Sequence, residues 1–277
     1  MKNYLILFLL IILSGQRIFG QPINCPECKY LLDTTIHIMK INSVNAKTVD
    51  WKKVETEINN LSKKCQNLYE LGPSFNYLYN ALNDFHGAFF IGDSSYNWEQ
   101  KAPVYSKAIN DEFEKAVHGI PLKTAIVENE YGYLRIPSMM SFLYGQNVSD
   151  SLCRLLRQNI KGLIIDLRLN AGGNMYPMLL GVNPVLGNGK IGSFNVSGKT
   201  NQDWLLQDNN FYVDTTLVTS LKSGCIIRAD NIPVVLICSN STGSAGEDFI
   251  IAFKGRPNTV LIGEKTAGYV TINDGFV

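Results

Sequence analysis

This sequence has few histidines, few long apolar runs and almost no excess of positive over negative charge. Each of these shortages excludes a class of function. Three histidines occur in 277 residues, and no second Cys-x-x-Cys or His-x-x-x-His pair completes a set of four metal ligands. We therefore expect no metal and no cofactor. The 25 Lys and Arg balance 24 Asp and Glu, and no basic stripe interleaved with aromatic residues occurs. This balance argues against a nucleic-acid partner.

The one long apolar run lies at the start of the chain, where Lys2 precedes Leu5–Leu13 and residues 14–20 become mostly small or polar. This is the pattern of a signal peptide, and we expect residues 1–20 to be cleaved off after Gly20. The run is too short to span about 30 Å of hydrocarbon, and no cysteine at the cut offers a lipid anchor. The chain is therefore expected to be secreted or periplasmic, with no stable membrane anchor after signal cleavage.

Export changes how the six cysteines are interpreted. Cys25 and Cys28 form a Cys-Pro-Glu-Cys motif directly after the signal segment. A redox-active motif of this kind belongs at the start of a helix that follows a buried strand. We therefore expect a structural disulfide or two free thiols here. Cys153 and Cys238 lie in apolar surroundings and are expected to be buried as small hydrophobic side chains.

The first part of the mature chain shows a helical pattern. Over residues 26–83, apolar positions such as Val54 and Ile58 recur at helical spacing with Lys and Glu between them,. Residues 106–117 predict a short surface helix. We therefore expect a mostly helical region over 21–125.

From residue 126 onward the pattern becomes that of an α/β fold. Strands are expected at 131–136, 162–167, 234–238 and 260–262, with a helix capped by Ser149 and Asp150 and another over 245–254,. The expected fold class is α/β, a mixed sheet with covering helices, preceded by the helical N-terminal region. Because the sequence ends on an apolar pair without a cap, we expect this 126–277 core to be incomplete at its C-terminus.

A buried strand runs directly into a loop with two adjacent glycines, Gly172 and Gly173. Glycine lets a backbone approach a ligand closely, so the two N–H groups are candidate hydrogen-bond donors. The alternative is a tight turn without a ligand. Asp166 and Arg168 flank the strand end, where they can pair with each other.

Ser244 lies where an expected strand meets the start of a helix. A hydroxyl there stands at the positive end of the helix dipole, which stabilises a developing oxyanion. The alternative is structural, because Ser244 followed by Glu247 is also a capping box. Small neighbours, namely Gly243, Ala245 and Gly246, leave space around the hydroxyl and favour the nucleophile.

A serine nucleophile needs a base, and histidine is the side chain that ordinarily titrates near neutrality. His86 lies at an expected helix end beside a glycine. It is either a capping residue or that base. His37 lies within an expected helix and His118 at the end of another, so neither is a stronger candidate.

Three segments together resemble one known family. Residues 162–173 (GLIIDLRLNAGG) and 244–247 (SAGE), the latter followed by 262–268 (IGEKTAG), resemble two signatures of the tail-specific, or C-terminal-processing, serine proteases. Residues 83–86 (NDFH) resemble the histidine-using branch, which is similar to the tricorn protease core and to bacterial secreted members. The resemblance covers about 78–277.

The resemblance implies a core of the crotonase/Clp protease type and a serine-type endopeptidase that acts on peptide or protein substrates. It places the nucleophile at Ser244 and the base at His86. The oxyanion hole would be the N–H of Ala245 with that of Gly172 or Gly173. The alternative function is that of a non-catalytic ligand-binding protein on the same scaffold.

Two positions depart from the family pattern. Many members carry a lysine base where this chain has Tyr269, so a Ser–Lys pair is not available there, and Lys265 falls at a variable position. Phe85 replaces the serine that orients the histidine in the tricorn protease, so Asp84 or a distant acid would have to do so. The spacing between the histidine and the first core strand is also too short for the PDZ domain of many members.

Overall fold

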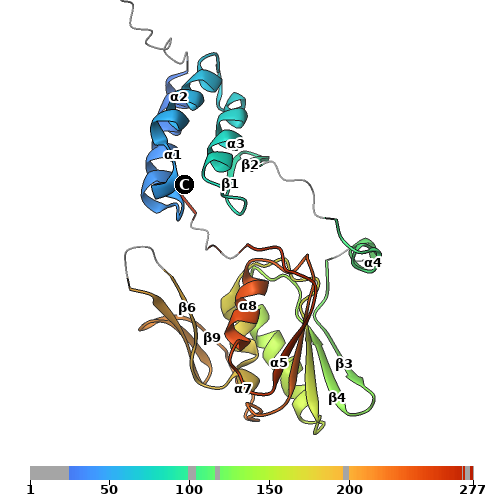
Figure 1. Ribbon diagram of the computed structural model, residues 1–277. Coiled ribbons are helices and arrows are strands. Elements are labelled where there is room, and N and C mark those ends of the chain that lie inside the picture. The colour runs from blue at the N-terminus through green and yellow to red at the C-terminus, as the bar shows by residue number, and fades with distance from the viewer. Residues whose placement is uncertain are drawn as a thin grey trace, which may run out of the picture. The chain divides into compact units, whose positions relative to one another are not determined.

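The computed structural model describes residues 25–98, 104–115, 119–195, 200–269, 271 and 275–276. They belong to two units, residues 1–99 and 100–277, here called the helical unit and the core unit (Figure 1). The units are described separately, because their relative position is not determined. The expected signal peptide lies outside the described residues. Over the described ranges, no helix is both long and apolar enough to cross a membrane.

The helical unit confirms the amphipathic pattern. It contains α1 (Pro26–Asn42), α2 (Trp51–Ser62), α3 (Gly72–Ala81), the 3-10 turns Ala46–Thr48 and Leu68–Leu71, and the hairpin β1 (Ala88–Ile91) with β2 (Ser94–Asn97). Asp50 caps α2 by accepting from the N–H of Lys53,. Val54 and Ile58 are buried together with apolar residues of α1 and α3. The spacing seen in the sequence is therefore the buried face of α2.

The Cys-Pro-Glu-Cys motif forms a disulfide in the structure. Cys25 and Cys28 are bonded to each other, and Cys25 is also the N-cap of α1, its sulfur accepting from the N–H of Cys28 at 3.1 Å. Both side chains are buried. Of the two alternatives open at the sequence level, the structure has the disulfide.

The core unit is built on a five-stranded mixed sheet with strand order β11-β10-β5-β4-β3. Its strands are β3 (Lys123–Val127), β4 (Tyr131–Arg135), β5 (Gly162–Asp166), β10 (Val234–Cys238) and β11 (Thr259–Gly263). β3 alone is antiparallel to its neighbour. The four expected strands are confirmed, and the expected region boundary at residue 125 falls inside β3, which pairs with the core.

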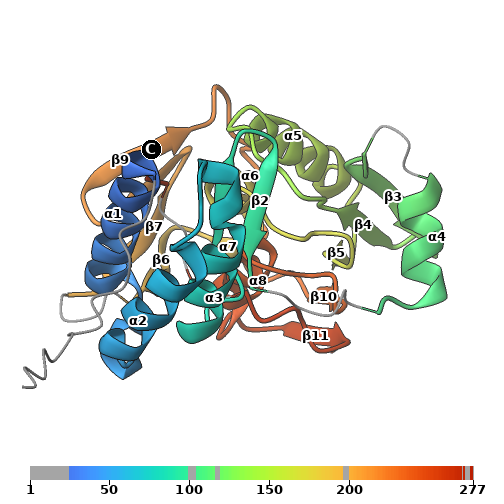
Figure 2. The ribbon, with the colours of Figure 1, turned by 90° about the horizontal axis from the view of Figure 1, so that it is seen from above.

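Helices form a middle layer between this sheet and a second one (Figures 1 and 2). They are α5 (Tyr144–Leu156), α6 (Met175–Gly181), α7 (Asn183–Leu186) and α8 (Ala245–Phe253), while α4 (Lys107–Lys115) lies outside the layer. α5 packs on β3 and β4, and α6 packs on α5, α8 and the second sheet. One hydrophobic core therefore runs through all three layers.

The second sheet was not predicted. It is an antiparallel meander of β6 (Gly189–Phe194), β7 (Gln202–Gln207), β8 (Asn210–Val213) and β9 (Thr216–Ser220). Alternation in 203–206 and positive φ angles at Asp208 and Asp214 account for it. Asp tolerates the left-handed region that hairpin turns require, and this signal was present in the sequence.

The expected cap of α5 is wrong. The helix begins at Tyr144, so Ser149 and Asp150 lie in its interior. The extra turn packs closely against α6, since a Cβ on Gly145 would lie 3.1 Å from the Pro177 side chain, and one on Gly181 would lie 2.6 Å from that of Val148. This contact between helices, which no local signal reports, extends α5 toward its N-terminus.

The interpretation of Cys153 as a simple buried side chain is also wrong. Cys153 is buried, but it is bonded to Cys225, 72 residues away. Cys238 is buried and free, as expected, and so is Cys65. Only the packing of the 221–228 segment onto α5 brings the first pair together.

Candidate active site

Two loops meet at one edge of the core sheet. β5 and β10 are parallel neighbours, so the segments that follow them leave the sheet side by side. The Ser239 hydroxyl donates to the carbonyl of Arg168 at 2.6 Å, and the Thr242 hydroxyl donates to that of Leu167 at 2.8 Å. The glycine-rich loop and the serine loop are therefore fastened together by buried hydrogen bonds.

Asn170 adds a second fastening. Its carbonyl accepts from the N–H of Gly243 at 3.0 Å, and a Cβ on Gly246 would lie 2.6 Å from the same oxygen. The fully buried Asn170 side chain also donates to the carbonyl of Ile136. These polar contacts were not predicted, because they depend on which strands are neighbours.

Ser244 stands between β10 and α8 in a strained backbone conformation. Its φ is 50° and its ψ is −122°, a combination of backbone angles that residues other than glycine avoid. Such a conformation costs on the order of 1–3 kcal/mol and is retained where the surroundings enforce it. A sharp strand-to-helix turn of this kind projects the nucleophilic serine of α/β-hydrolases.

Gly172 lies directly against Ser244. A Cβ on Gly172 would be 2.7 Å from the Ser244 Cβ and 3.2 Å from its Oγ. The φ of Gly172 is +117°, which side chains also disfavour. The structure thus brings the two predicted motifs into contact, and it requires glycine at the point of contact.

The two glycine N–H groups are not equivalent. That of Gly172 donates to the Oδ1 of Asn170 at 3.0 Å. Gly173 lies opposite Met139 in an isolated β-bridge, but the residues on either side of it make the hydrogen bonds. The N–H of Met139 donates to the Gly172 carbonyl, and the N–H of Asn174 donates to the Met139 carbonyl. Within the described part of the chain, the N–H of Gly173 therefore has no acceptor. Gly173 is the better candidate donor of the two.

The N–H of Ala245 also has no hydrogen-bond acceptor among the described residues. It is the first N–H of α8 and, as at any helix start, it has no acceptor within its own helix. Ala245 itself is buried. Each of the two loops therefore carries one N–H without an acceptor among the described residues, that of Ala245, which follows Ser244, and that of Gly173, which follows Gly172.

Glu247 joins the serine loop to a third segment. Its Oε2 accepts from the N–H of Ser244 at 3.0 Å, which is the acidic half of the predicted capping box. Its Oε1 accepts from the Thr266 hydroxyl at 2.6 Å and from the N–H of Gly268 at 2.8 Å. The same carboxylate therefore caps the start of α8 and fixes the 266–268 segment beside the serine loop.

Tyr269, which occupies the family's lysine position, lies next to the serine loop. A Cβ on Gly243 would be 2.9 Å from the Tyr269 ring. The segment is held there because the N–H of Ala267 donates to the carbonyl of Thr242 at 2.9 Å. An aromatic ring, rather than an amine, therefore borders the site at this position.

Asp248 follows Glu247 on α8 and carries a perturbed carboxyl. Burial, together with the nearby charge of Glu247, raises the pKa of Asp248 from 3.8 to about 7. No hydrogen bond or ion pair to another described residue compensates its charge. The helix that begins at Ser244 therefore carries a group that titrates near neutrality.

Asp166 and Arg168 pair as expected. The guanidinium donates to both carboxylate oxygens at 3.0 and 2.8 Å, and the Tyr133 hydroxyl donates to the Oδ2 of Asp166 at 2.6 Å. Burial alone would raise the pKa of the Asp166 carboxyl, but these hydrogen bonds outweigh it and hold the pKa below its usual value,. The pair supports the end of β5 and is committed to that role.

His86 lies in the helical unit, in the bend between α3 and β1. The Oδ1 of Asp84 accepts from the N–H groups of His86 and Gly87 at 3.1 and 2.8 Å. Asp84 thus positions the backbone of His86. Phe85 lies edge-on to Trp98, with ring centroids 6.2 Å apart.

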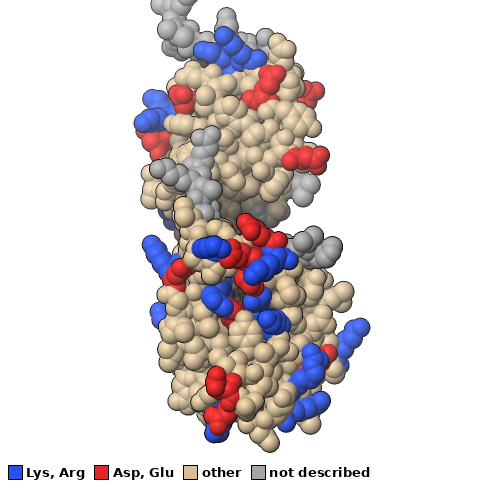
Figure 3. All heavy atoms as spheres, turned by 90° about the vertical axis from the view of Figure 1, so that its right-hand side faces the viewer, with Lys and Arg blue, Asp and Glu red and all other residues tan. Residues whose placement is uncertain are grey.

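The described residues hold no cluster of three or more His, Cys, Asp or Glu side chains that could bind a metal ion. The face of the molecule in Figure 3 carries Lys and Arg side chains interspersed with Asp and Glu.

Comparison with known proteins assigns the family. The sequence pattern of peptidase family S41 matches residues 130–277, which is just over half of the chain. The match includes the glycine-rich loop, the serine loop and the 266–269 segment, whereas His86 lies outside it. The chain belongs to peptidase family S41. The expected resemblance to the tail-specific proteases is therefore confirmed.

Individual relatives are distant. The nisin-resistance protein of Lactococcus lactis subsp. lactis is 31% identical over 121 residues, which are 43% of this chain and 36% of that protein. The matched part of the chain thus spans about a third of the length of this curated relative.

Solved structures share the fold of this S41 chain. A lipoprotein from Streptococcus agalactiae is 18% identical, with a TM-score of 0.63 over 94% of this chain and 82% of that one. A putative peptidase from Parabacteroides merdae is also 18% identical, with a TM-score of 0.58 over 87% and 76%. At this identity the similarity establishes the fold, and the expected fold class is confirmed.

Proposed function

We propose that the chain is an exported serine endopeptidase in which Ser244 is the nucleophile. One observation carries the proposal. Ser244 is held at a positive φ where the serine loop meets the glycine-rich loop, and each of these loops has one N–H without an acceptor among the described residues. Strain is retained at functional sites when the surroundings enforce it. Capping α8 alone does not call for this conformation, since N-cap residues ordinarily adopt an extended backbone.

In the proposed reaction, the Ser244 Oγ attacks the scissile carbonyl while His86 takes its proton. The N–H groups of Ala245 and Gly173 hold the oxyanion. His86 then protonates the leaving amine, and a water molecule hydrolyses the acyl-enzyme by the same route. The proposal requires His86 to reach the Ser244 hydroxyl when the two units assemble.

Labelling with a fluorophosphonate tests the nucleophile, because only an activated serine reacts. Ser244→Ala should abolish labelling and peptide hydrolysis. Ser241→Ala is the matched control, since Ser241 lies in the same loop, is buried, and has no hydrogen-bond partner for its hydroxyl. Labelling that survives in Ser244→Ala would refute the assignment. A folded wild type that never labels would favour the non-catalytic binding protein.

The base is tested in the helical unit. His86→Ala should lower the labelling rate by about 10²–10⁴-fold, the usual contribution of a general base. His37→Ala provides the control on the same unit. A His86→Ala protein that labels at the wild-type rate would show that another group, such as Lys265, activates the serine.

Export and substrate also belong to the proposal. The signal-like run supports secretion or transfer to the periplasm, and membership of peptidase family S41 supports a peptide or protein as substrate. Casein is a suitable general substrate, and nisin is a rational second one because a relative is named for resistance to it. Recovery of the protein outside the cytoplasm with an N-terminus at residue 21 would support export with cleavage, whereas recovery in the cytoplasm alone with an intact Met1 would oppose it.

A further inference from the structure

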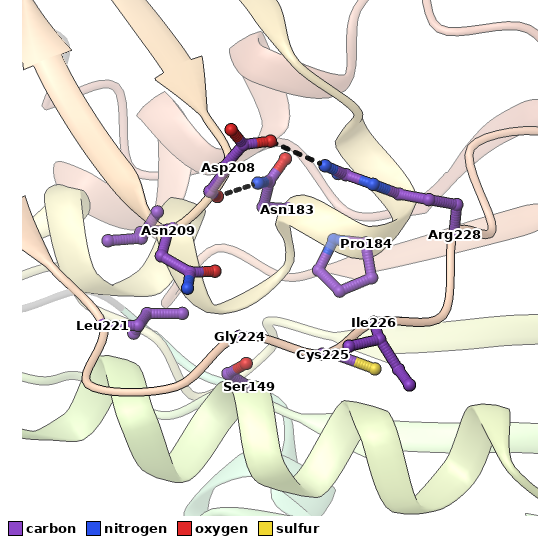
Figure 4. A pocket seen from close by; sticks show the side chains of 11 residues that line it. Ser149, Asn183, Pro184, Asp208, Asn209, Leu221, Gly224, Cys225, Ile226 and Arg228 are labelled. Atoms are coloured by element: carbon purple, nitrogen blue, oxygen red, sulfur yellow. Dashed lines mark hydrogen bonds and ion pairs between the residues drawn. The ribbon is translucent and has the colours of Figure 1, made fainter.

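A second cavity in the core unit shares no lining residue with the loops around Ser244. It has a volume of about 300 Å³ and lies between α5, the end of α6 with α7, the β7–β8 turn and the 221–228 segment (Figure 4). This volume is at the lower end of the range for small-molecule sites. The cavity can therefore hold a small ligand.

Ser149 contributes a buried hydroxyl to the cavity. Its side chain rises from α5 toward the cavity (Figure 4), and the residue is 1% exposed. A serine inside a helix ordinarily donates to the carbonyl four residues before it. Among the described residues, the Ser149 Oγ has no partner, which leaves it able to donate and to accept.

Asn183 contributes an acceptor of fixed direction. Its Nδ2 donates to the carbonyl of Asp208, which sets the orientation of the amide. Its Oδ1 has no donor among the described residues, and the side chain is 4% exposed. Buried polar atoms are nearly always satisfied, so a ligand here must supply an N–H or O–H for Asn183.

Two opposite charges lie at the edge of the cavity. Arg228 donates through Nη2 to the Oδ1 of Asp208 at 3.2 Å (Figure 4). Within the described chain, the Nε and Nη1 of Arg228 and the Oδ2 of Asp208 make no hydrogen bond. A guanidinium binds a carboxylate well, whereas a multiply charged anion such as phosphate would be repelled by Asp208. A zwitterion matches both charges.

The wall formed by 221–228 is held in place. The Cys153–Cys225 disulfide ties it to α5, and Gln146 of α5 accepts from the N–H of Lys222 at 2.9 Å and donates to the carbonyl of Ser223 at 2.8 Å. A preformed site of this kind avoids the ordering cost of binding.

We propose that this cavity binds a short zwitterionic peptide of dipeptide size. A ligand amide N–H donates to the Oδ1 of Asn183, the Ser149 hydroxyl bonds the ligand's polar backbone, and the ligand carboxylate pairs with Arg228. The proposal does not depend on catalysis at Ser244. The Ser244→Ala protein is therefore used for the test, so that no peptide is consumed.

Isothermal titration calorimetry with alanyl-leucine measures binding, with its C-terminal amide as the matched ligand. Binding of alanyl-leucine at millimolar concentration is expected, and Arg228→Gln should weaken it about tenfold while leaving the affinity for the amide unchanged. Equal losses for both ligands would refute the role of Arg228. Absence of heat with alanyl-leucine in folded protein would overturn the proposal and indicate a cavity filled by water.

Ser149→Ala is the sharper variant, because it removes a hydroxyl that has no partner in the fold. The variant should have the same melting temperature as the parent protein or a higher one, and it should bind alanyl-leucine about tenfold more weakly. Ser74→Ala is the matched control, since Ser74 is also buried without a partner but lies on α3 of the helical unit. Identical affinities in the two variants would overturn the proposal.

Discussion

The Glu247 carboxylate accepts a hydrogen bond from the Thr266 hydroxyl at 2.6 Å. Through this contact, a residue on the first turn of α8 fixes a segment that follows β11. Its other oxygen holds the N–H of Ser244. One buried carboxylate therefore sets the position of the serine loop and of the chain that borders it.

Glu247→Gln should destabilise the core unit and reduce fluorophosphonate labelling. A glutamine has one carbonyl oxygen, so its amide group must face either the Ser244 N–H or the Thr266–Gly268 donors. The expected loss is about 1–3 kcal/mol, measured by denaturant unfolding. Glu264→Gln is the control, because Glu264 is exposed and, among the described residues, its carboxylate accepts one hydrogen bond, from the N–H of Asn240. Equal losses in both variants would contradict the linking role of Glu247.

Gly172→Ala should abolish labelling of Ser244. Its Cβ would lie 2.7 Å from the Ser244 Cβ, so Ser244 must shift. Gly189→Ala is a close control, since Gly189 has a φ of +118° against +117° for Gly172, with no atom within 4 Å of an added Cβ. Both variants bear similar backbone strain, and only Gly172→Ala bears the clash. Equal labelling of the two would show that the contact is unimportant.

Stability should fall with pH through the range in which Asp248 titrates. Its pKa in the folded protein is about 7 against an ordinary 3.8, so the folded state binds more protons than the unfolded state between these values. Its contribution is thus fully present below about pH 4 and is lost as pH rises to about 7. Asp248→Asn should remove this slope, whereas Asn at the exposed Asp93 should not. Parallel pH profiles for wild type and Asp248→Asn would refute the prediction.

The Cys153–Cys225 disulfide should stabilise the core unit by about 4 kcal/mol, because it closes a loop with a separation of 72 residues,. Replacing both cysteines by serine should therefore lower the melting temperature more than the same change at Cys25 and Cys28, which are separated by 3. Alkylation in denaturant without reductant should modify two thiols, those of Cys65 and Cys238. Modification of four or six would show that the assigned pairing is wrong.

Elements with strong local signals were predictable. Buried parallel strands are continuous apolar runs, which is why β5 and β10 stand out in the sequence. α2 shows its buried face as a periodic pattern. By contrast, the start of α5 was misplaced, because the packing of Gly145 against Pro177 outweighs the capping preference of Ser149. The meander of β6–β9 was overlooked although its turns carry Asp residues suited to positive φ.

The sequence by itself determined the family and the core strands and singled out Ser244 as the candidate nucleophile, since each rests on residue types at fixed spacing along the chain. It left open whether Ser244 caps or reacts and which glycine offers its N–H. The tertiary structure decided that Gly172 is bonded to Asn170 while Gly173 is not, and that Cys153 meets Cys225. These are contacts between segments distant in the chain, and their formation depends on which strands become neighbours in the sheet. No local pattern records that choice, because the free energy that makes it comes from burial shared across the whole core.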